Sequence, residues 1–238
     1  MSAYTKSDLM TVVIARYLSN VKNCFHGLAS TVPMVAIMLA RKLYNPKLLY
    51  LNITGGVNVE NVELNASTDG GNLLRTSKSV FHLTDIFDFA ARGQLEVALL
   101  SGGQIDAGAQ LNNTVIGSYE RPKVKLPGGA GSAVLIPSCK RAFIWKTKHD
   151  KRSFVERVDF VTSRGNIDYV FTPLCVFKKI DDRLMLDAIM PDSSLEEIIE
   201  NTGFQLICNS DKVLDAPNEL ELRALYELDP ARCRDAAF

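Results

Sequence analysis

The most suggestive residues for chemistry are glycines gathered in the segment Gly128-Gly129-Ala130-Gly131-Ser132. A loop of this composition before an apolar segment can turn several main-chain N–H groups toward an anion or a developing oxyanion. A tight connection between sheet elements explains the same composition. The loop is neither a GxGxxG motif nor a Walker loop, because no Lys-Ser/Thr pair follows it, so it gives nucleotide binding little support.

Three further turns directly follow predicted buried strands, where open α/β sheets bind their ligands. They cover residues 27–30, 54–56 and 101–103. Ser30 could hold a substrate carboxylate or carbonyl, or it could simply cap the helix after it. Asp106, in the unusual stretch Gly102-Gly103-Gln104-Ile105-Asp106, could pair with a base, and we favour the interpretation that it fixes a loop.

Other familiar catalytic patterns are missing from the sequence. His26, His82 and His149 have no metal-ligand spacing and no HExxH motif occurs, so each is interpreted as a surface or polar-core residue. No GxSxG motif occurs either, which argues against a hydrolase serine. The residues alone therefore predict an α/β protein with glycine-rich, ligand-binding loops.

Composition narrows the class of protein further. The chain has 238 residues, 47% of them hydrophobic and 23% charged, with 27 basic and 27 acidic residues. The zero net charge argues against a nucleic-acid binder and suits a chain covered by a partner subunit. The five cysteines form no CxxC pair, so we expect reduced thiols and no zinc site. No signal peptide and no apolar run of about 20 residues is visible, which predicts a soluble, cytoplasmic protein.

Hydrophobic periodicity predicts alternating helices and buried strands in a single domain covering residues 1–238. The expected helices cover residues 7–19, 31–44, 85–92 and 195–202. The expected strands cover residues 23–26, 48–53, 95–100, 142–146, 157–162, 169–177, 184–189 and 204–208. Because the second half is richer in strands, a mixed α/β sheet that is mostly parallel is predicted.

Taken in order, several stretches of the chain resemble β-type subunits of the class I CoA-transferase family, in particular those of glutaconate CoA-transferases. The similar stretches are ARKLYNP, GGQID, NNTVIGSYERPKVKLPGGAGS, HDKRSFVERVDFVTS, SLEEIIENTGF and ELRALYELDPARCRD. The resemblance implies a three-layer α/β fold of the CoA-transferase type. It also implies a heteromeric enzyme with an α-subunit partner, in an α2β2 heterotetramer. Coenzyme A enters as part of an acyl-CoA substrate, with no permanently bound cofactor, metal, nucleic acid or membrane.

The resemblance also assigns roles within the predicted site. In the true transferases a glutamate attacks the thioester, and here Ile53 takes that position; Glu60 and Glu63 fall too far along the chain. The N–H of Gly129 is expected to help hold the oxyanion. The basic run from Lys146 to Arg152 could meet the phosphates of CoA or be a solvated loop. We expect substrate and CoA to be bound by Ser30, Thr54, Gly55, Gln104, Gly128 and Gly131.

Members of the family without the glutamate are similar to this chain, most closely those that decarboxylate 3-methylglutaconyl-CoA. Decarboxylation needs charge stabilisation and a desolvated carboxylate but no protein nucleophile. The leading hypothesis is therefore a decarboxylase or lyase β subunit acting on a short unsaturated dicarboxylyl-CoA. The alternatives are a genuine CoA-transferase, a ring-opening acyl-CoA hydrolase and a non-catalytic ligand-binding subunit. Any acid or base is expected from the α subunit.

Overall fold

The computed structural model describes residues 4–238, which divide into two compact units. Unit 1 consists of Met1–Leu99 and Pro217–Phe238, and unit 2 of Leu100–Ala216. The prediction of a single domain over residues 1–238 stays a prediction. Among the described residues, no helix is both long and apolar enough to cross a membrane.

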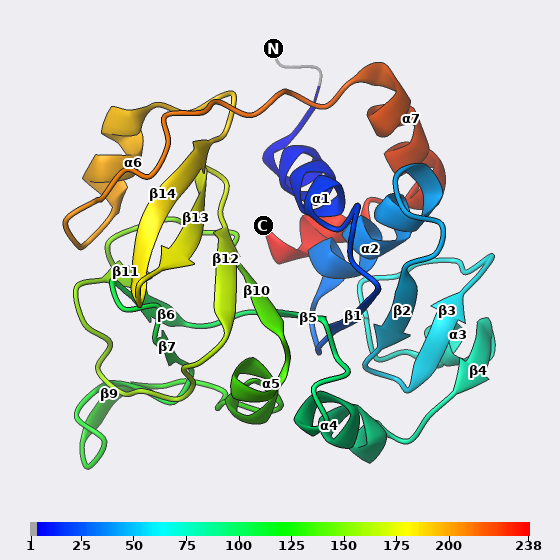
Figure 1. The fold of residues 1–238 in the computed structure, drawn as a ribbon, viewed down its shortest axis with the longest axis horizontal. Helices are drawn as coiled ribbons and strands as arrows, with labels where there is room; N and C mark the ends of the chain where they lie inside the picture. Colours follow the sequence, from blue (N-terminus) through cyan, green and yellow to red (C-terminus); the bar gives the residue numbers. More distant parts are fainter. Residues whose placement is uncertain (1–3) are drawn as a thin grey trace. The chain divides into compact units, whose positions relative to one another are not determined.

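Unit 1 is built around five strands in the order β5-β1-β2-β3-β4, and Figure 1 shows β2, β3 and β4 side by side. The strand β1 runs parallel to both of its neighbours, whereas the pairs β2–β3 and β3–β4 are antiparallel. The elements are α1 (Lys6–Tyr17), β1 (Asn23–His26), α2 (Thr31–Leu43), β2 (Leu49–Asn52), β3 (Gly56–Val59), α3 (Gly71–Arg75), β4 (Ser77–Val80), α4 (Leu83–Ala91), β5 (Val97–Leu100), α7 (Glu219–Leu228) and η1 (Cys233–Ala237).

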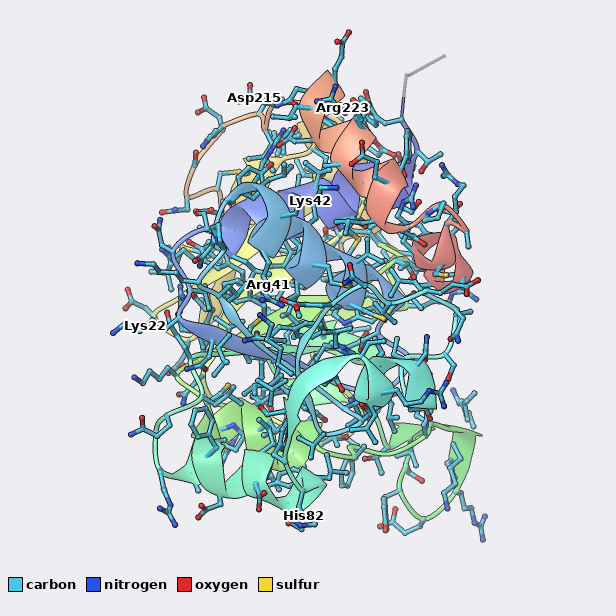
Figure 2. All side chains as sticks on the ribbon, turned by 90° about the vertical axis from the view of Figure 1, so that its right-hand side faces the viewer. Lys22, Arg41, Lys42, His82, Asp215 and Arg223 are labelled. Carbon is cyan, nitrogen blue, oxygen red and sulfur yellow. The ribbon has the colours of Figure 1, made fainter. Side chains whose placement is uncertain are left out.

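Helices cover both faces of the unit 1 sheet. The apolar helix α2 packs on β1 and β2 and ends before Asn45-Pro46, since a residue preceding proline disfavours helical backbone. On the other face, Leu49 and Leu51 of β2 meet α4 across an apolar cavity of about 190 Å³. Side chains alternate along a strand, so Tyr50 points away from this cavity. Figure 2 shows Lys42 where α2 lies beside α7, and its ammonium pairs with Glu227 (2.7 Å).

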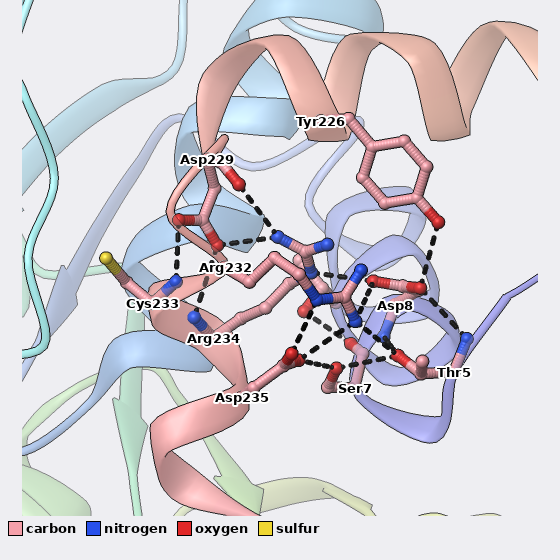
Figure 3. Close-up of polar contacts among 10 residues, drawn as sticks. Thr5, Ser7, Asp8, Tyr226, Asp229, Arg232, Cys233, Arg234 and Asp235 are labelled. Atoms are coloured by element: carbon pink, nitrogen blue, oxygen red, sulfur yellow. Dashed lines mark hydrogen bonds and ion pairs between the residues drawn. The ribbon is translucent and has the colours of Figure 1, made fainter.

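A buried ionic cluster ties the two ends of the chain together within unit 1 (Figure 3). The guanidinium of Arg234 donates to Asp8 and to Asp229, at 2.7 Å each, and all three side chains are fully buried. Burial opposes ionisation of Asp8, but hydrogen bonds from Thr5 and Arg234 outweigh it, and the pKa of that carboxyl is lowered. Buried charges of this kind are costly unless paired, so the cluster fixes how η1 docks on α1.

Unit 2 contains four strands in the order β14-β13-β12-β10, a three-stranded sheet β11-β6-β7 and the hairpin β8–β9 (Figure 1). The pair β10–β12 is parallel, and β12–β13 and β13–β14 are antiparallel. The elements are β6 (Gln104–Asp106), β7 (Leu111–Asn112), β8 (Val115–Gly117), β9 (Pro122–Lys125), α5 (Ser132–Ser138), β10 (Arg141–Trp145), β11 (Phe154–Val155), β12 (Ile167–Phe171), β13 (Cys175–Ile180), β14 (Arg183–Ile189) and α6 (Leu195–Asn201).

The predicted α/β class with a mixed sheet is confirmed, and three predicted strands of unit 2 are wrong. The stretch 169–177 is two antiparallel strands, β12 and β13, because the chain turns at residues 172–174. Residues 157–162 alternate like a strand, but the N–H of Val158 bonds instead to the carboxylate of Asp106. Residues 204–208 form only a single bridge, from Cys208 to Leu186.

Candidate functional site

The turn after β2, where the resemblance expects a nucleophile, is organised by the buried amide of Asn52. Its Oδ1 accepts hydrogen bonds from the N–H groups of Thr54 (3.0 Å) and Gly56 (3.1 Å). Gly55 has a φ of +88°, and a Cβ there would lie 2.3 Å from the main-chain oxygen of Phe81. Only glycine fits such a position, so the backbone around Ile53 is held in one conformation.

The turn itself carries no carboxylate. Ile53 is partly exposed, and Thr54 donates its hydroxyl hydrogen bond back to Asn52. Glu60 lies beyond the far end of β3 and forms an exposed ion pair with Lys78 (2.7 Å). Glu63 is also exposed and follows Glu60 in the same loop. The residues of this turn therefore offer main-chain groups, a hydroxyl and an alkyl side chain.

The turn after β1 lies at the same edge of the sheet, because β1 and β2 are parallel and His26 is in register with Asn52. Ser30 is only 3% exposed, and its hydroxyl donates to the main-chain oxygen of Leu28 (2.9 Å) rather than capping α2. Leu28 is instead the exposed side chain of this turn, at 55%. The predicted role of Ser30 in substrate binding stays a prediction, and the turn presents an apolar side chain outward.

Beneath these two turns, a buried histidine and tyrosine link β1 to β2. The Nδ1 of His26 faces the main-chain oxygen of Gly27 (2.9 Å), so this nitrogen carries the proton. The Nε2 must then accept a hydrogen bond from the hydroxyl of Tyr50 (2.7 Å). Burial lowers the pKa of His26 to about 4, so the imidazole is neutral and acts as a polar-core residue, as predicted.

The glycine loop of unit 2 presents free main-chain donors. The N–H of Gly128 donates to the main-chain oxygen of Asn113 (2.6 Å), and the N–H of Ser132 donates to the oxygen of Gly129 (2.8 Å). Among residues 4–238, the N–H of Gly129 has no hydrogen-bond acceptor. A Cβ on Gly129 would lie 2.8 Å from the Cγ2 of Thr162, so the backbone packs tightly there. The loop can therefore direct a rigidly held N–H at a bound oxyanion.

The other predicted residues of unit 2 have structural partners. Gln104 is buried, and its Oε1 accepts from the side chain of Asn112 (2.7 Å). The main-chain oxygen of Gly131 accepts from Leu135 at the start of α5 (2.8 Å). Asp106 accepts three main-chain N–H bonds, from Gly108, Gln110 and Val158, which confirms that it fixes a loop. Roles for Gln104 and Gly131 in ligand binding stay predictions.

One residue of this region did not stand out in the sequence beyond its place in a basic run. The ammonium of Lys146, just after β10, donates to the main-chain oxygens of Gly102 (2.6 Å) and Gly103 (3.0 Å). The N–H of Gly103 in turn donates to the Oδ1 of Asn113 (2.7 Å), whose main-chain oxygen holds Gly128. Lys146 therefore shares one hydrogen-bonded framework with the glycine loop.

The predicted site residues thus form two groups. Ser30, Ile53, Thr54 and Gly55 lie at one edge of the unit 1 sheet, and Gln104, Gly128, Gly129 and Gly131 lie in unit 2. In the part of the chain that the structure describes, no group of three His, Cys, Asp or Glu side chains could hold a metal ion. The chemistry available is a main-chain oxyanion donor, a lysine ammonium and an apolar, nucleophile-free turn.

Known proteins share both this sequence and this fold. A family model described as Coenzyme A transferase matches residues 8–201. The β subunit of the 3-oxoadipate CoA-transferase of Pseudomonas knackmussii is 31% identical, over 96% of this chain and 95% of its own. The β subunit of the glutaconate CoA-transferase of Acidaminococcus fermentans is 25% identical, over 96% of this chain and 94% of its own.

Solved structures agree with this assignment. The decarboxylase AibA/AibB superposes with a TM-score of 0.92 at 27% identity, covering 98% of both chains. The glutaconate CoA-transferase of Acidaminococcus fermentans superposes with a TM-score of 0.88, covering 97% of both chains. The chain therefore belongs to the Coenzyme A transferase family. Within that family it is a β-type subunit, the counterpart of the two transferase β subunits.

Proposed function

We propose that this chain, with an α-subunit partner in an α2β2 complex, decarboxylates a short unsaturated dicarboxylyl-CoA. The observation that carries the proposal is the turn after β2, where a partly exposed isoleucine, Ile53, stands between Asn52 and Thr54 with no carboxylate in the turn. Transfer of CoA through a glutamyl thioester needs a carboxylate nucleophile. The similarity to the decarboxylase AibA/AibB supports the same conclusion.

The chemistry follows from what the two groups of residues can supply. The bond between the acyl chain and its carboxylate breaks, CO2 leaves, and the electron pair moves through the double bond onto the thioester oxygen. The N–H of Gly129, which has no acceptor among residues 4–238, is placed to stabilise this oxygen. A proton taken up at carbon completes the product. The apolar side chains of Leu28 and Ile53 favour a desolvated carboxylate, whose ground state is less stabilised than in water.

Coenzyme A enters this reaction as part of the substrate. The glycine loop and the turn of Thr54 and Gly55 are the proposed points of contact for the thioester. Because the relatives are β subunits of two-subunit enzymes, the proposed complex includes an α subunit that supplies any further acid or base.

The test uses the purified complex with its α subunit, glutaconyl-CoA or 3-methylglutaconyl-CoA, and excess acetate, with the CoA products read by mass. We expect CO2 and the shortened thioester, with no acetyl-CoA. Acetyl-CoA from the wild-type complex would overturn the proposal. The variant Ile53→Glu places a carboxylate in the turn and should yield acetyl-CoA, whereas Ile53→Gln, with a side chain of the same shape as glutamate, should not.

A genuine CoA-transferase is the second candidate, because the relative at 31% identity is a CoA-transferase subunit. It requires a nucleophile from elsewhere than the turn of Ile53. Trapping of a covalent CoA adduct on the wild-type β chain, located by peptide mass mapping, would favour this candidate and identify the carboxylate.

A further inference from the structure

Lys146 is a charged side chain without an ionic partner. Among the described residues, no carboxylate lies within ion-pair distance of its ammonium, which donates instead to the main-chain oxygens of Gly102 (2.6 Å) and Gly103 (3.0 Å). An ammonium has three N–H donors, so one donor remains. The side chain is only partly buried, so a ligand can reach it.

The energetic argument points to an anion. Partial burial of an ammonium is unfavourable unless the charge is compensated, and two neutral carbonyl groups compensate it only in part. The result is a lowered pKa, about 8, with burial as the main cause; the nearby Asp150 opposes the shift and Lys148 adds to it. Both of these charged residues lie on the loop after β10, whereas the turn at residues 101–103 and the end of β12 contribute main-chain groups.

The position of Lys146 indicates which part of a ligand it meets. The carbonyl groups that hold it belong to the turn whose Gly103 N–H donates to Asn113 (2.7 Å). Asn113 also accepts the N–H of Gly128, the first residue of the glycine loop (2.6 Å). Since that loop is the proposed contact for the thioester oxygen, the nearest anionic group on the substrate is the carboxylate of the acyl chain. A phosphate would ordinarily be held by several donors, and here one N–H is left.

We infer that Lys146 binds a carboxylate oxygen of the acyl group and thereby selects dicarboxylyl-CoA thioesters over monocarboxylyl ones. The identity of the ligand as an acyl-CoA rests on the proposed function. The inference itself concerns binding and requires no turnover.

The experiment measures dissociation constants of the complex with its α subunit for glutaryl-CoA, valeryl-CoA and free CoA, by calorimetry at pH 7. Glutaryl-CoA is saturated and lacks the double bond that the proposed reaction needs, whereas valeryl-CoA has the same chain length without the carboxylate. The variants are Lys146→Met, Lys146→Arg and, as a matched control on the same loop, the exposed Lys148→Met.

We expect Lys146→Met to weaken glutaryl-CoA by roughly tenfold or more, since a hydrogen bond to a charged group contributes about 1.5–3 kcal/mol. Valeryl-CoA and free CoA should bind that variant as they bind the wild type, and Lys148→Met should change none of the three. Affinity of the wild type for glutaryl-CoA should fall as the pH rises above about 8, where the free lysine loses its proton. Lys146→Arg should keep the preference and lose this pH dependence, because an arginine stays protonated.

An equal loss for all three ligands in Lys146→Met would assign Lys146 to the CoA phosphates or to the fold and overturn the inference. Unchanged binding of glutaryl-CoA, or no binding of either thioester by the wild type, would overturn it as well. If glutaryl-CoA binds through Lys146 but glutaconyl-CoA releases no CO2, the inference stands and the proposed reaction is wrong.

Discussion

The turn after β2 in unit 1 and the glycine loop in unit 2 are both rigid, but they are held in opposite ways. In unit 1 the side chain of Asn52 turns inward and uses its oxygen on the N–H groups of Thr54 and Gly56. In unit 2 the Asn113 main-chain oxygen holds Gly128, and the N–H of Gly129 keeps no partner among residues 4–238. The first arrangement satisfies the turn internally, whereas the second leaves a donor for a ligand.

This difference shows how one chain can lose a nucleophile and keep a stabilising site. The turn of Ile53 retains a fixed backbone with an alkyl side chain where chemistry would need a carboxylate. The glycine loop retains the donor that any thioester reaction needs, whether transfer, hydrolysis or decarboxylation. The predictions below perturb one unit at a time.

The largest expected effect is on the stability of unit 1. Arg234→Met leaves the buried carboxylates of Asp8 and Asp229 without their cation, and breaking such a pair costs about 3–5 kcal/mol. Urea denaturation of the complex should show this loss. The neighbouring Arg232→Met removes a half-exposed ion pair with Asp235 and should cost about 1 kcal/mol or less. Equal losses for the two variants would show that the buried cluster does not stabilise unit 1 as argued.

The next effect is on catalysis through unit 2. In Gly129→Ala the new Cβ would lie 2.8 Å from the Thr162 Cγ2, so the loop must move and its N–H with it. Loss of one oxyanion donor typically lowers kcat by about 10²–10³-fold. Thr162→Ser keeps the hydroxyl that accepts from Asn113 and removes the clashing methyl, so the double variant should regain part of the rate. A full rate in Gly129→Ala would exclude this N–H from the reaction.

Each unit also contains one buried neutral histidine, and both should make stability depend on pH. Burial lowers the pKa of His26 and of His149 to about 4, below the ordinary value of 6.5. The folded protein therefore binds fewer protons than the unfolded one, and stability is lost as the pH falls from about 6.5 toward 4. Each histidine should cost about 2 kcal/mol at pH 5, where most carboxylates are still ionised.

Denaturation of the complex at pH 7, 6 and 5 would measure this slope. The variant His149→Gln removes one titrating group, so its curve should be lower at pH 7 and shallower toward pH 5. A wild-type stability that stays constant over this range would contradict the assignment of neutral, buried imidazoles.

The smallest effect separates support of the unit 1 turns from direct chemistry. Tyr50→Phe removes the hydroxyl that donates to the Nε2 of His26 (2.7 Å) and leaves that nitrogen unsatisfied. The expected loss of stability is about 1–2 kcal/mol. The rate at saturating substrate should stay near that of the wild type, because the glycine loop is untouched. A loss of rate with unchanged stability would instead place Tyr50 in the reaction.

The amino-acid sequence by itself determined the elements whose local signals agree with their packing. The strand Asn23–His26 is observed as predicted, and the second predicted strand is trimmed by two residues to Leu49–Asn52. The helix before Asn45-Pro46 ends where proline requires it. The glycine cluster, the missing carboxylate at Ile53 and the structural role of Asp106 could also be predicted, since they depend on residue type and order.

Only the tertiary structure decided which donors are used and which stay free. Alternation suggested a strand at residues 157–162, but side chains distant in sequence take its N–H groups, as Asp106 does for Val158. Ser30 is a good helix cap by type, yet its hydroxyl bonds to Leu28 and Leu28 points outward. Lys146 looks like one charge among several until the fold packs it on the Gly102 and Gly103 carbonyl groups. Burial and hydrogen-bond partners depend on long-range contacts, which no local pattern encodes.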